Sequence, residues 1–198
     1  MQDSRVKMIA KIAILGTMSF ILMALDFPVP FIPVFYKLDF SEVVILIGGF
    51  ALGPGAACGI EALKVVLNVL FNGTQTAYVG ELANFLIGCS FVLPAALIYK
   101  KNRTRKGAVT AMICGTLMMA LVGVVLNYAV LLPAYSHFYH LPMDAIIGMG
   151  SALIPIIKDK LTFVLFATTP FNLFKGLVVS VITMLVYNRM SPLSKLRT

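Results

Sequence analysis

Residues 40–71 read FSEVVILIGGFALGPGAACGIEALKVVLNVLF, a mostly apolar stretch that holds one strong turn signal, Gly53-Pro54-Gly55. About 20 residues are enough to cross the hydrocarbon core of a bilayer as a helix. The stretch is therefore either one overlong helix or two short helices that meet at the glycine and proline residues. This choice decides how many times the chain crosses a membrane.

The composition is that of an integral membrane protein. Of the 198 residues, 60% are hydrophobic and 12% are charged, whereas about a quarter of the residues in soluble domains are charged. Beyond the opening stretch, hydropathy predicts clear spans at about 6–26, 80–99, 108–131 and 169–188. A chain of this length is expected to form a single transmembrane domain over 1–198.

The basic residues determine the expected topology. Most of them fall in three clusters that flank apolar segments, at 5–11, 100–106 and 189–197. Such clusters mark the cytoplasmic side, so an even number of helices must separate the first from the second. The opening stretch is then two helices, at about 40–53 and 55–72. The expected fold is all-α: a bundle of six transmembrane helices in membrane lipid, with cytoplasmic N- and C-termini. A nucleic-acid partner is not expected.

Three connections are expected on the outer side, near 27–39, 72–79 and 132–166. The last includes 145–157, which is mostly apolar but short for a span. We expect an outer loop or re-entrant segment there that packs on the bundle. The first is rich in proline and aromatic residues, so it is either a lid over apolar surface or a rigid connection.

Polar side chains converge in depth near the outer face. Asn68, Asn84, Asn127 and Asn172 each lie on a different predicted helix, and Glu81 and Lys175 lie close to two of them. The last helix is expected to begin at Thr169-Pro170. Buried amides need partners, so they either join helices and cap their ends or line a ligand pocket. Because asparagine offers donors and an acceptor, such a pocket suits an imide or a pyrimidine-like ring, and an unpaired Lys175 would add a donor.

The remaining polar groups give weaker signals. Glu61 and Lys64 lie three residues apart nearer mid-membrane, as a buried ion pair or as a proton or ion relay. His137 and His140 are expected to be solvated loop residues, because no carboxylate or cysteine completes a metal site. No motif predicts a catalytic site, so we expect neither an enzyme nor a resident cofactor.

Over its full length the chain resembles the substrate-binding S components of energy-coupling factor (ECF) vitamin transporters, and most closely the riboflavin-specific ones. The stretches that carry the resemblance are Lys37-Leu38-Asp39-Phe40-Ser41-Glu42, Leu52-Gly53-Pro54-Gly55, Gly80-Glu81-Leu82-Ala83-Asn84-Phe85 and Pro170-Phe171-Asn172-Leu173-Phe174-Lys175-Gly176. The resemblance implies capture of riboflavin, the transported ligand, at the outer face of the bacterial cytoplasmic membrane. It also implies docking onto a membrane T component that is driven by two ATPase subunits.

Residue roles follow from the resemblance by position. It implies ligand hydrogen bonds from Asn172 and Lys175, with Asn84, Glu81 and Asn127 beside them. It also implies apolar cover from Phe31, Phe35 and Leu38. The small residues of the first helix that meet the T component correspond to Ala13 and Thr17. An S component for another vitamin, a small membrane enzyme acting on a lipid, and an autonomous carrier remain alternatives.

Overall fold

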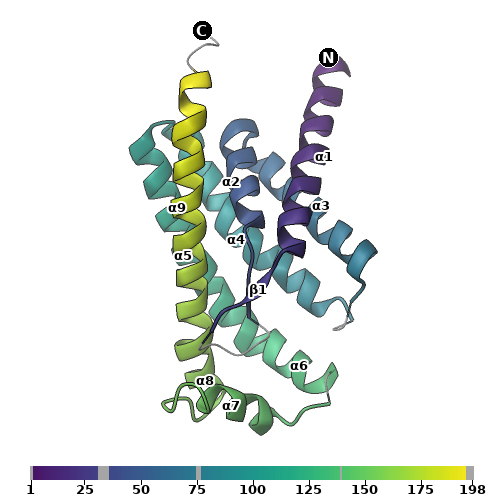
Figure 1. The fold of residues 1–198 in the computed structure, drawn as a ribbon, viewed down its shortest axis with the longest axis vertical. Helices are drawn as coiled ribbons and strands as arrows, with labels where there is room; N and C mark the ends of the chain where they lie inside the picture. Colours follow the sequence, from purple (N-terminus) through teal and green to yellow (C-terminus); the bar gives the residue numbers. More distant parts are fainter. Residues whose placement is uncertain (1, 31–35, 75–76, 139, 195–198) are drawn as a thin grey trace.

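The computed structural model describes residues 2–30, 36–74, 77–138 and 140–194, which are predominantly helical (Figure 1). The helices are α1 (Gln2–Ala24), α2 (Ser41–Leu52), α3 (Pro54–Asn72), α4 (Val79–Lys101), α5 (Arg105–Leu126), α6 (Leu132–Phe138), α7 (Met143–Ser151), α8 (Lys160–Phe163) and α9 (Thr169–Ser194). Two π-helical segments, η1 (Asn127–Leu131) and η2 (Val164–Thr168), interrupt the α-helical runs. Strands β1 (Phe27–Pro28) and β2 (Lys37–Leu38) pair antiparallel, with Phe27 opposite Leu38.

Helix α2 is the centre of the bundle. It packs against α1, α3, α4 and α9, and its side chains are mostly buried, with Ile45 and Leu46 fully enclosed. The chain turns sharply after Leu52, where Gly53 has a φ of +101° that only glycine adopts without strain. Pro54 then occupies the first turn of α3, where its missing N–H would have no intrahelical partner. Residues 40–71 therefore form two helices.

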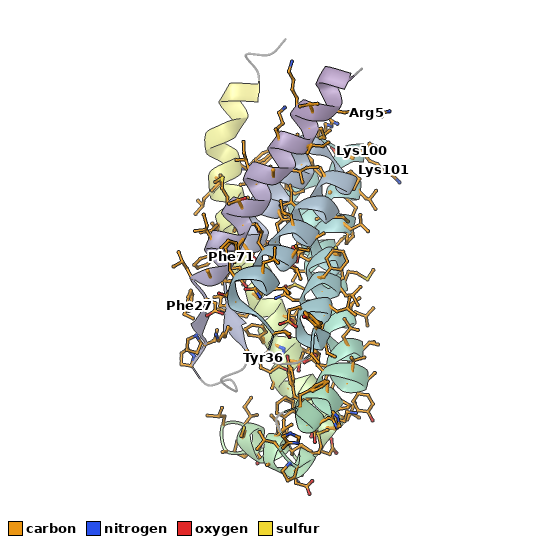
Figure 2. The ribbon with its side chains drawn as sticks, turned by 90° about the vertical axis from the view of Figure 1, so that its right-hand side faces the viewer. Arg5, Phe27, Tyr36, Phe71, Lys100 and Lys101 are labelled. Carbon is orange, nitrogen blue, oxygen red and sulfur yellow. The ribbon has the colours of Figure 1, made fainter. Side chains whose placement is uncertain are left out.

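Five described helical runs are long and apolar enough to cross a membrane, and α2 is a shorter apolar helix. Large apolar side chains such as Ile14, Ile113 and Leu121 are exposed on the outside of the bundle, as expected for contact with lipid. The first residues of α1 and the last of α9 lie at the same end (Figure 1). Arg5, Lys100 and Lys101 also lie toward that end (Figure 2). The fold is thus that of a multi-pass helical membrane protein.

The last two helical runs are longer than the sequence predicted. The span predicted at 108–131 lies within a run from Arg105 to Phe138, and the span predicted at 169–188 lies within a run that begins at Lys160. The outer connection predicted at 132–166 is correspondingly shorter, because much of it is helical. Figure 1 shows α6, α7 and α8 together at the end of the bundle away from the termini.

The π-helical segments explain why two prolines do not end these runs. Pro133 and Pro170 are each the second residue after a π-helical segment. There the N–H groups of Leu132 and Thr169 donate to the carbonyl oxygens five residues earlier. The wider turn accommodates a proline that would otherwise break the helix. Helix α9 begins at Thr169, as predicted, but it continues without a break from a helical run that starts at Lys160.

Helix α7 covers the first part of the segment 145–157, which the sequence left as an outer loop or a re-entrant segment. Ile146 of α7 and the following Ile157 are buried against Phe163 of α8. This small apolar cluster is continuous with Tyr36 and Phe171, which belong to the site described below. The segment therefore packs on the bundle, as expected, and it supports one side of that site.

Candidate ligand-binding site

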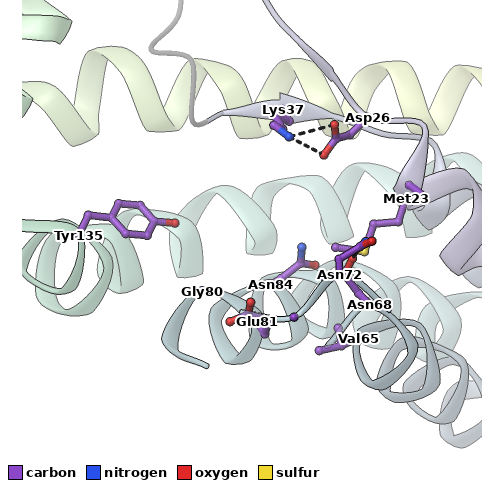
Figure 3. Close-up of a pocket in the computed structure, with 12 residues that line it drawn as sticks. Met23, Asp26, Lys37, Val65, Asn68, Asn72, Gly80, Glu81, Asn84 and Tyr135 are labelled. Atoms are coloured by element: carbon purple, nitrogen blue, oxygen red, sulfur yellow. Dashed lines mark hydrogen bonds and ion pairs between the residues drawn. The ribbon is translucent and has the colours of Figure 1, made fainter. Parts of the chain in front are cut away.

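Two connected hollows lie between the helices toward the end opposite the termini. The inner cavity has a volume of about 230 Å³, and the vestibule beside it has a volume of about 440 Å³ (Figure 3). Residues that line both are Met23, Asp26, Lys37, Gly80, Asn84 and Tyr135. Together the two hollows fall within the range of about 300–1,000 Å³ that is usual for small-molecule sites.

The structure brings together most of the polar residues that the sequence singled out. Asn84, Asn127, Asn172 and Lys175 line the inner cavity. Asn68, Glu81 and Asn84 line the vestibule. The four asparagines thus all line two hollows that share several of their lining residues.

The other predicted residues lie elsewhere. Leu38 is buried in the short sheet and is not among the residues that line either hollow. Phe31 and Phe35 lie outside the described residues. Ala13 and Thr17 are exposed on α1, where the Thr17 hydroxyl donates to the Ala13 carbonyl at 2.9 Å. Their predicted roles remain predictions.

Lys175 is not the unpaired lysine that the sequence suggested. Its Nζ lies 2.9 Å from Oδ2 of Asp39, and both side chains are largely buried. The other oxygen of Asp39 accepts from the backbone N–H and the hydroxyl of Ser41. Burial alone would raise the pKa of Asp39, but Lys175, Lys64 and the Ser41 hydrogen bond together hold it well below its usual range. Lys175 can still donate to a ligand, because an ammonium group has three donors.

A second buried lysine lies beneath the cavity. The Nζ atom of Lys64 lies 2.6 Å from Glu61 and 3.0 Å from Glu42, and 3.4 Å from the Ser41 hydroxyl. The expected Glu61–Lys64 ion pair is therefore present, and Glu42 extends it. Only Glu42 of these residues also lines the inner cavity.

Tyr36 joins the loop that precedes β2 to both π-helical segments. Its hydroxyl donates to Oδ1 of Asn127 at 3.0 Å and is hydrogen-bonded to Thr168, while its ring packs on Phe171 with the ring centres 5.0 Å apart. Burial raises the pKa of Tyr36 well above its usual value, so it remains a donor. Asn127 also donates from Nδ2 to the carbonyl of Gly123 at 2.8 Å, so its amide is held by contacts at both ends.

Asn172 has a buried donor that no described residue satisfies. The side chain is 4% exposed, and its Nδ2 atom has no hydrogen-bond partner. It lies against Gly123 of α5, where an added Cβ would be only 2.1 Å from Nδ2. A buried amide donor without a partner costs about 1–3 kcal/mol, so this atom is suited to meet a ligand acceptor.

Sequence reasoning assigned no ligand-binding role to several residues of the site, among them Tyr36, Asp39 and Glu42. Asp39 and Glu42 flank the start of α2, and an acidic pair there was visible in the sequence as a possible partner for buried lysines. Tyr36 had no comparable signal, because the proline-rich loop around it was interpreted only as apolar cover.

The fold and the cavity define a class of protein: a helical membrane protein that encloses a small-molecule site. Residues 7–187 match the family model described as "ECF transporter, substrate-specific component". The chain belongs to this family, which confirms the resemblance noted from the sequence. The family consists of transporter components, which agrees with the expectation that the chain is not an enzyme.

Individual relatives point the same way. The chain is 34% identical to the riboflavin transporter FmnP of Bacillus subtilis (strain 168), over 95% of this chain and 94% of the relative. It is 36% identical to the riboflavin transporter RibU of Staphylococcus aureus (strain TCH60), over 93% and 90% of the two chains. A solved structure described as the S component of a bacterial ECF transporter is similar, with a TM-score of 0.75, 35% identity, and coverage of 96% of this chain and 99% of that one.

Proposed function

We propose that this chain is the riboflavin-binding subunit of an ECF-type, ATP-driven vitamin uptake transporter. Membership of the substrate-specific family and the similarity to riboflavin transporters support this proposal. The observation that carries it is the inner cavity, where the Asn172 amide and the Lys175 ammonium group lie beside the aromatic rings of Tyr36 and Phe171.

The chemistry of the site suits a flavin. An isoalloxazine ring is flat, and one edge carries an imide with two carbonyl acceptors on either side of an N–H donor. Asn172 and Lys175 supply donors for such carbonyls. The vestibule is richer in polar groups, including Asn68, Glu81 and Asn84, which suit the hydroxyl groups of a ribityl chain.

The proposal includes a topology. The whole chain, 1–198, acts as one transmembrane domain in the bacterial cytoplasmic membrane, with α2 as a sixth crossing and both termini in the cytoplasm. Arg5, Lys100 and Lys101 lie toward the end of the bundle that holds both termini, and these basic residues support this orientation. Riboflavin then enters from the outer side, beneath the loop that holds Phe31, Phe35 and Leu38.

The proposed partners are a membrane T component and two ATPase subunits. No ATP-binding motif occurs in the sequence, so uphill uptake needs energy from other subunits. The small residues Ala13 and Thr17, exposed on α1, offer a face that another helix can approach closely.

The test is direct binding to the purified, detergent-solubilised chain. We expect a stoichiometric flavin absorbance after purification or titration with riboflavin. Asn172→Ala should weaken binding by about 1–3 kcal/mol because a ligand acceptor loses its buried partner. The control is Asn102→Ala, an exposed amide between α4 and α5 that lines neither hollow. Binding of a different vitamin but not riboflavin would favour the alternative S-component function.

A further inference from the structure

The most buried of the polar residues that line the inner cavity is Glu42. Glu42 is the second residue of α2, is 2% exposed, and lines the cavity. Its Oε1 accepts from Lys64 at 3.0 Å, but its Oε2 has no hydrogen-bond partner among the described residues. Buried carboxylate oxygens nearly always have a hydrogen-bond partner. Oε2 of Glu42 is therefore a strong acceptor that is available to a ligand in the cavity.

Lys64 cannot easily turn to satisfy the second oxygen. Its Nζ donates to Oε1 of Glu42 and to the Ser41 hydroxyl, and it forms an ion pair with Glu61. These contacts of Lys64 do not use the acceptor capacity of Oε2. Because Glu42 lines the inner cavity, a molecule bound there can supply a donor to Oε2.

The same cavity is also lined by hydrogen-bond donors. Nδ2 of Asn172 is a buried donor without a partner among the described residues, and Nζ of Lys175 donates to Asp39. The inner cavity thus offers donors from Asn172 and Lys175 and an acceptor from Glu42 to its contents. This set complements an edge that alternates acceptor, donor and acceptor, as an imide does.

The residues that line the two hollows favour different parts of a ligand. Along α4 the lining residues pass inward from Glu81 in the vestibule through Asn84 to Ile87 in the inner cavity. The inner cavity also carries the apolar groups Met119 and Phe171. A flat ring is favoured there and a hydroxylated chain in the vestibule, because each part then meets groups of its own polarity.

We propose that Glu42 is a specificity-determining residue of the vitamin site: its Oε2 accepts the imide N–H of the ring, while Asn172 and Lys175 donate to the adjoining carbonyls. This inference rests on the proposed riboflavin-binding function and adds a residue to it. It explains why the cavity keeps a buried acid that the lysine beneath it does not fully satisfy. Ligands that lack a donor at this position would leave Oε2 unpaired and bind weakly.

The experiment compares riboflavin with its N3-methyl derivative, in which the imide donor is blocked, on the wild-type chain and on Glu42→Gln. In the variant, Lys64 still requires the side-chain oxygen, so the amide NH₂ is left to face the imide N–H. We expect riboflavin affinity to fall roughly tenfold or more, the size of effect associated with a lost charged hydrogen bond. The preference of the wild type for riboflavin over the methyl derivative should shrink by a similar factor.

Glu61→Gln is the matched control. Glu61 contacts the same lysine but does not line the cavity, so this variant should leave the ratio of the two affinities unchanged. An unchanged ratio in Glu42→Gln would overturn the inference, as would equal binding of the two ligands to the wild type, a measurement that needs no variant to fold. Failure of the wild type to bind riboflavin at all would instead refute the proposed function.

Discussion

The contribution of Asp39 to the stability of the fold can be measured through its dependence on pH. Its folded pKa is depressed, so it stabilises the fold above the unfolded value of about 3.9, and this stabilisation is lost as the pH falls through the folded pKa. Asp39→Asn leaves the buried Lys175 without its counter-charge and is expected to destabilise the chain by about 3 kcal/mol near neutral pH.

Thermal unfolding of both proteins between pH 3 and 8 checks this expectation. The gap between wild type and Asp39→Asn should be constant above about pH 5 and should narrow below about pH 4. The control is Asp26→Asn, whose ion pair with Lys37 is much more exposed, so about 1 kcal/mol or less is expected. A gap that persists unchanged into acid would contradict the assigned charge pairing.

Several of these residues could be found from the sequence, and others could not. The asparagines and Lys175 were visible because polar side chains are rare in apolar helices. The partner of Lys175 was not, because Asp39 lies 136 positions away and only the folded chain brings the two together. Tyr36 was missed for a similar reason: its hydrogen bonds join three separate segments of the chain.

At the scale of elements, the close approach of α5 and α9 positions Asn172. An alanine at position 123 would place its Cβ 2.1 Å from Nδ2 of Asn172, so Gly123→Ala must displace that amide. We expect riboflavin affinity to fall at least about tenfold, as for an overpacked site that costs 1–3 kcal/mol. Gly148→Ala in α7 is the control, since nothing lies within 4 Å of the added atom. Equal affinities in titrations of the two variants would refute this packing argument.

Riboflavin binding is also expected to depend on the two π-helical segments, which Tyr36 joins. Tyr36→Phe keeps the ring against Phe171 but removes the hydroxyl that joins Asn127 of η1 to Thr168 of η2. We expect a stability loss of about 1–2 kcal/mol and several-fold faster release of riboflavin in stopped-flow fluorescence.

Tyr128→Phe is a control within η1. Tyr128 is exposed, and Lys160 lies over its ring with Nζ 4.3 Å from the centre, a contact that phenylalanine preserves. Release from this variant should match the wild type. If both variants release riboflavin equally fast, the Tyr36 hydroxyl does not slow its release.

The helix breaks were predictable to different degrees. The turn at Gly53 followed from the sequence because glycine and proline mark it directly. The π-helical segments did not, since a single added residue per turn leaves the hydropathy of a helix almost unchanged. For this reason the lengths of the last two helical runs were underestimated.

At the scale of the whole molecule, ligand binding and partner docking occupy different surfaces. Ala13 and Thr17 lie on the exposed side of α1 and line neither hollow. Thr17→Trp should therefore leave riboflavin affinity within about twofold of wild type, while uptake in vesicles with the T component and ATPases falls at least about tenfold.

The control for docking is Ile113→Trp, a bulky change at an exposed apolar position of α5. It should leave both binding and uptake intact. Normal uptake by Thr17→Trp would place the docking face elsewhere on the molecule.

The ion pair between Glu42 of α2 and Lys64 of α3 has a consequence for insertion of the chain into the membrane. Each isolated charge at the middle of a membrane helix costs about 2.5–3.5 kcal/mol on insertion scales, and α2, at about 18 Å, is too short to span alone. Contact between Glu42 and Lys64 across the tight turn offsets both difficulties at once. The two segments should therefore leave the translocon as one helical hairpin, and removing the Glu42 carboxylate should reduce the insertion of both.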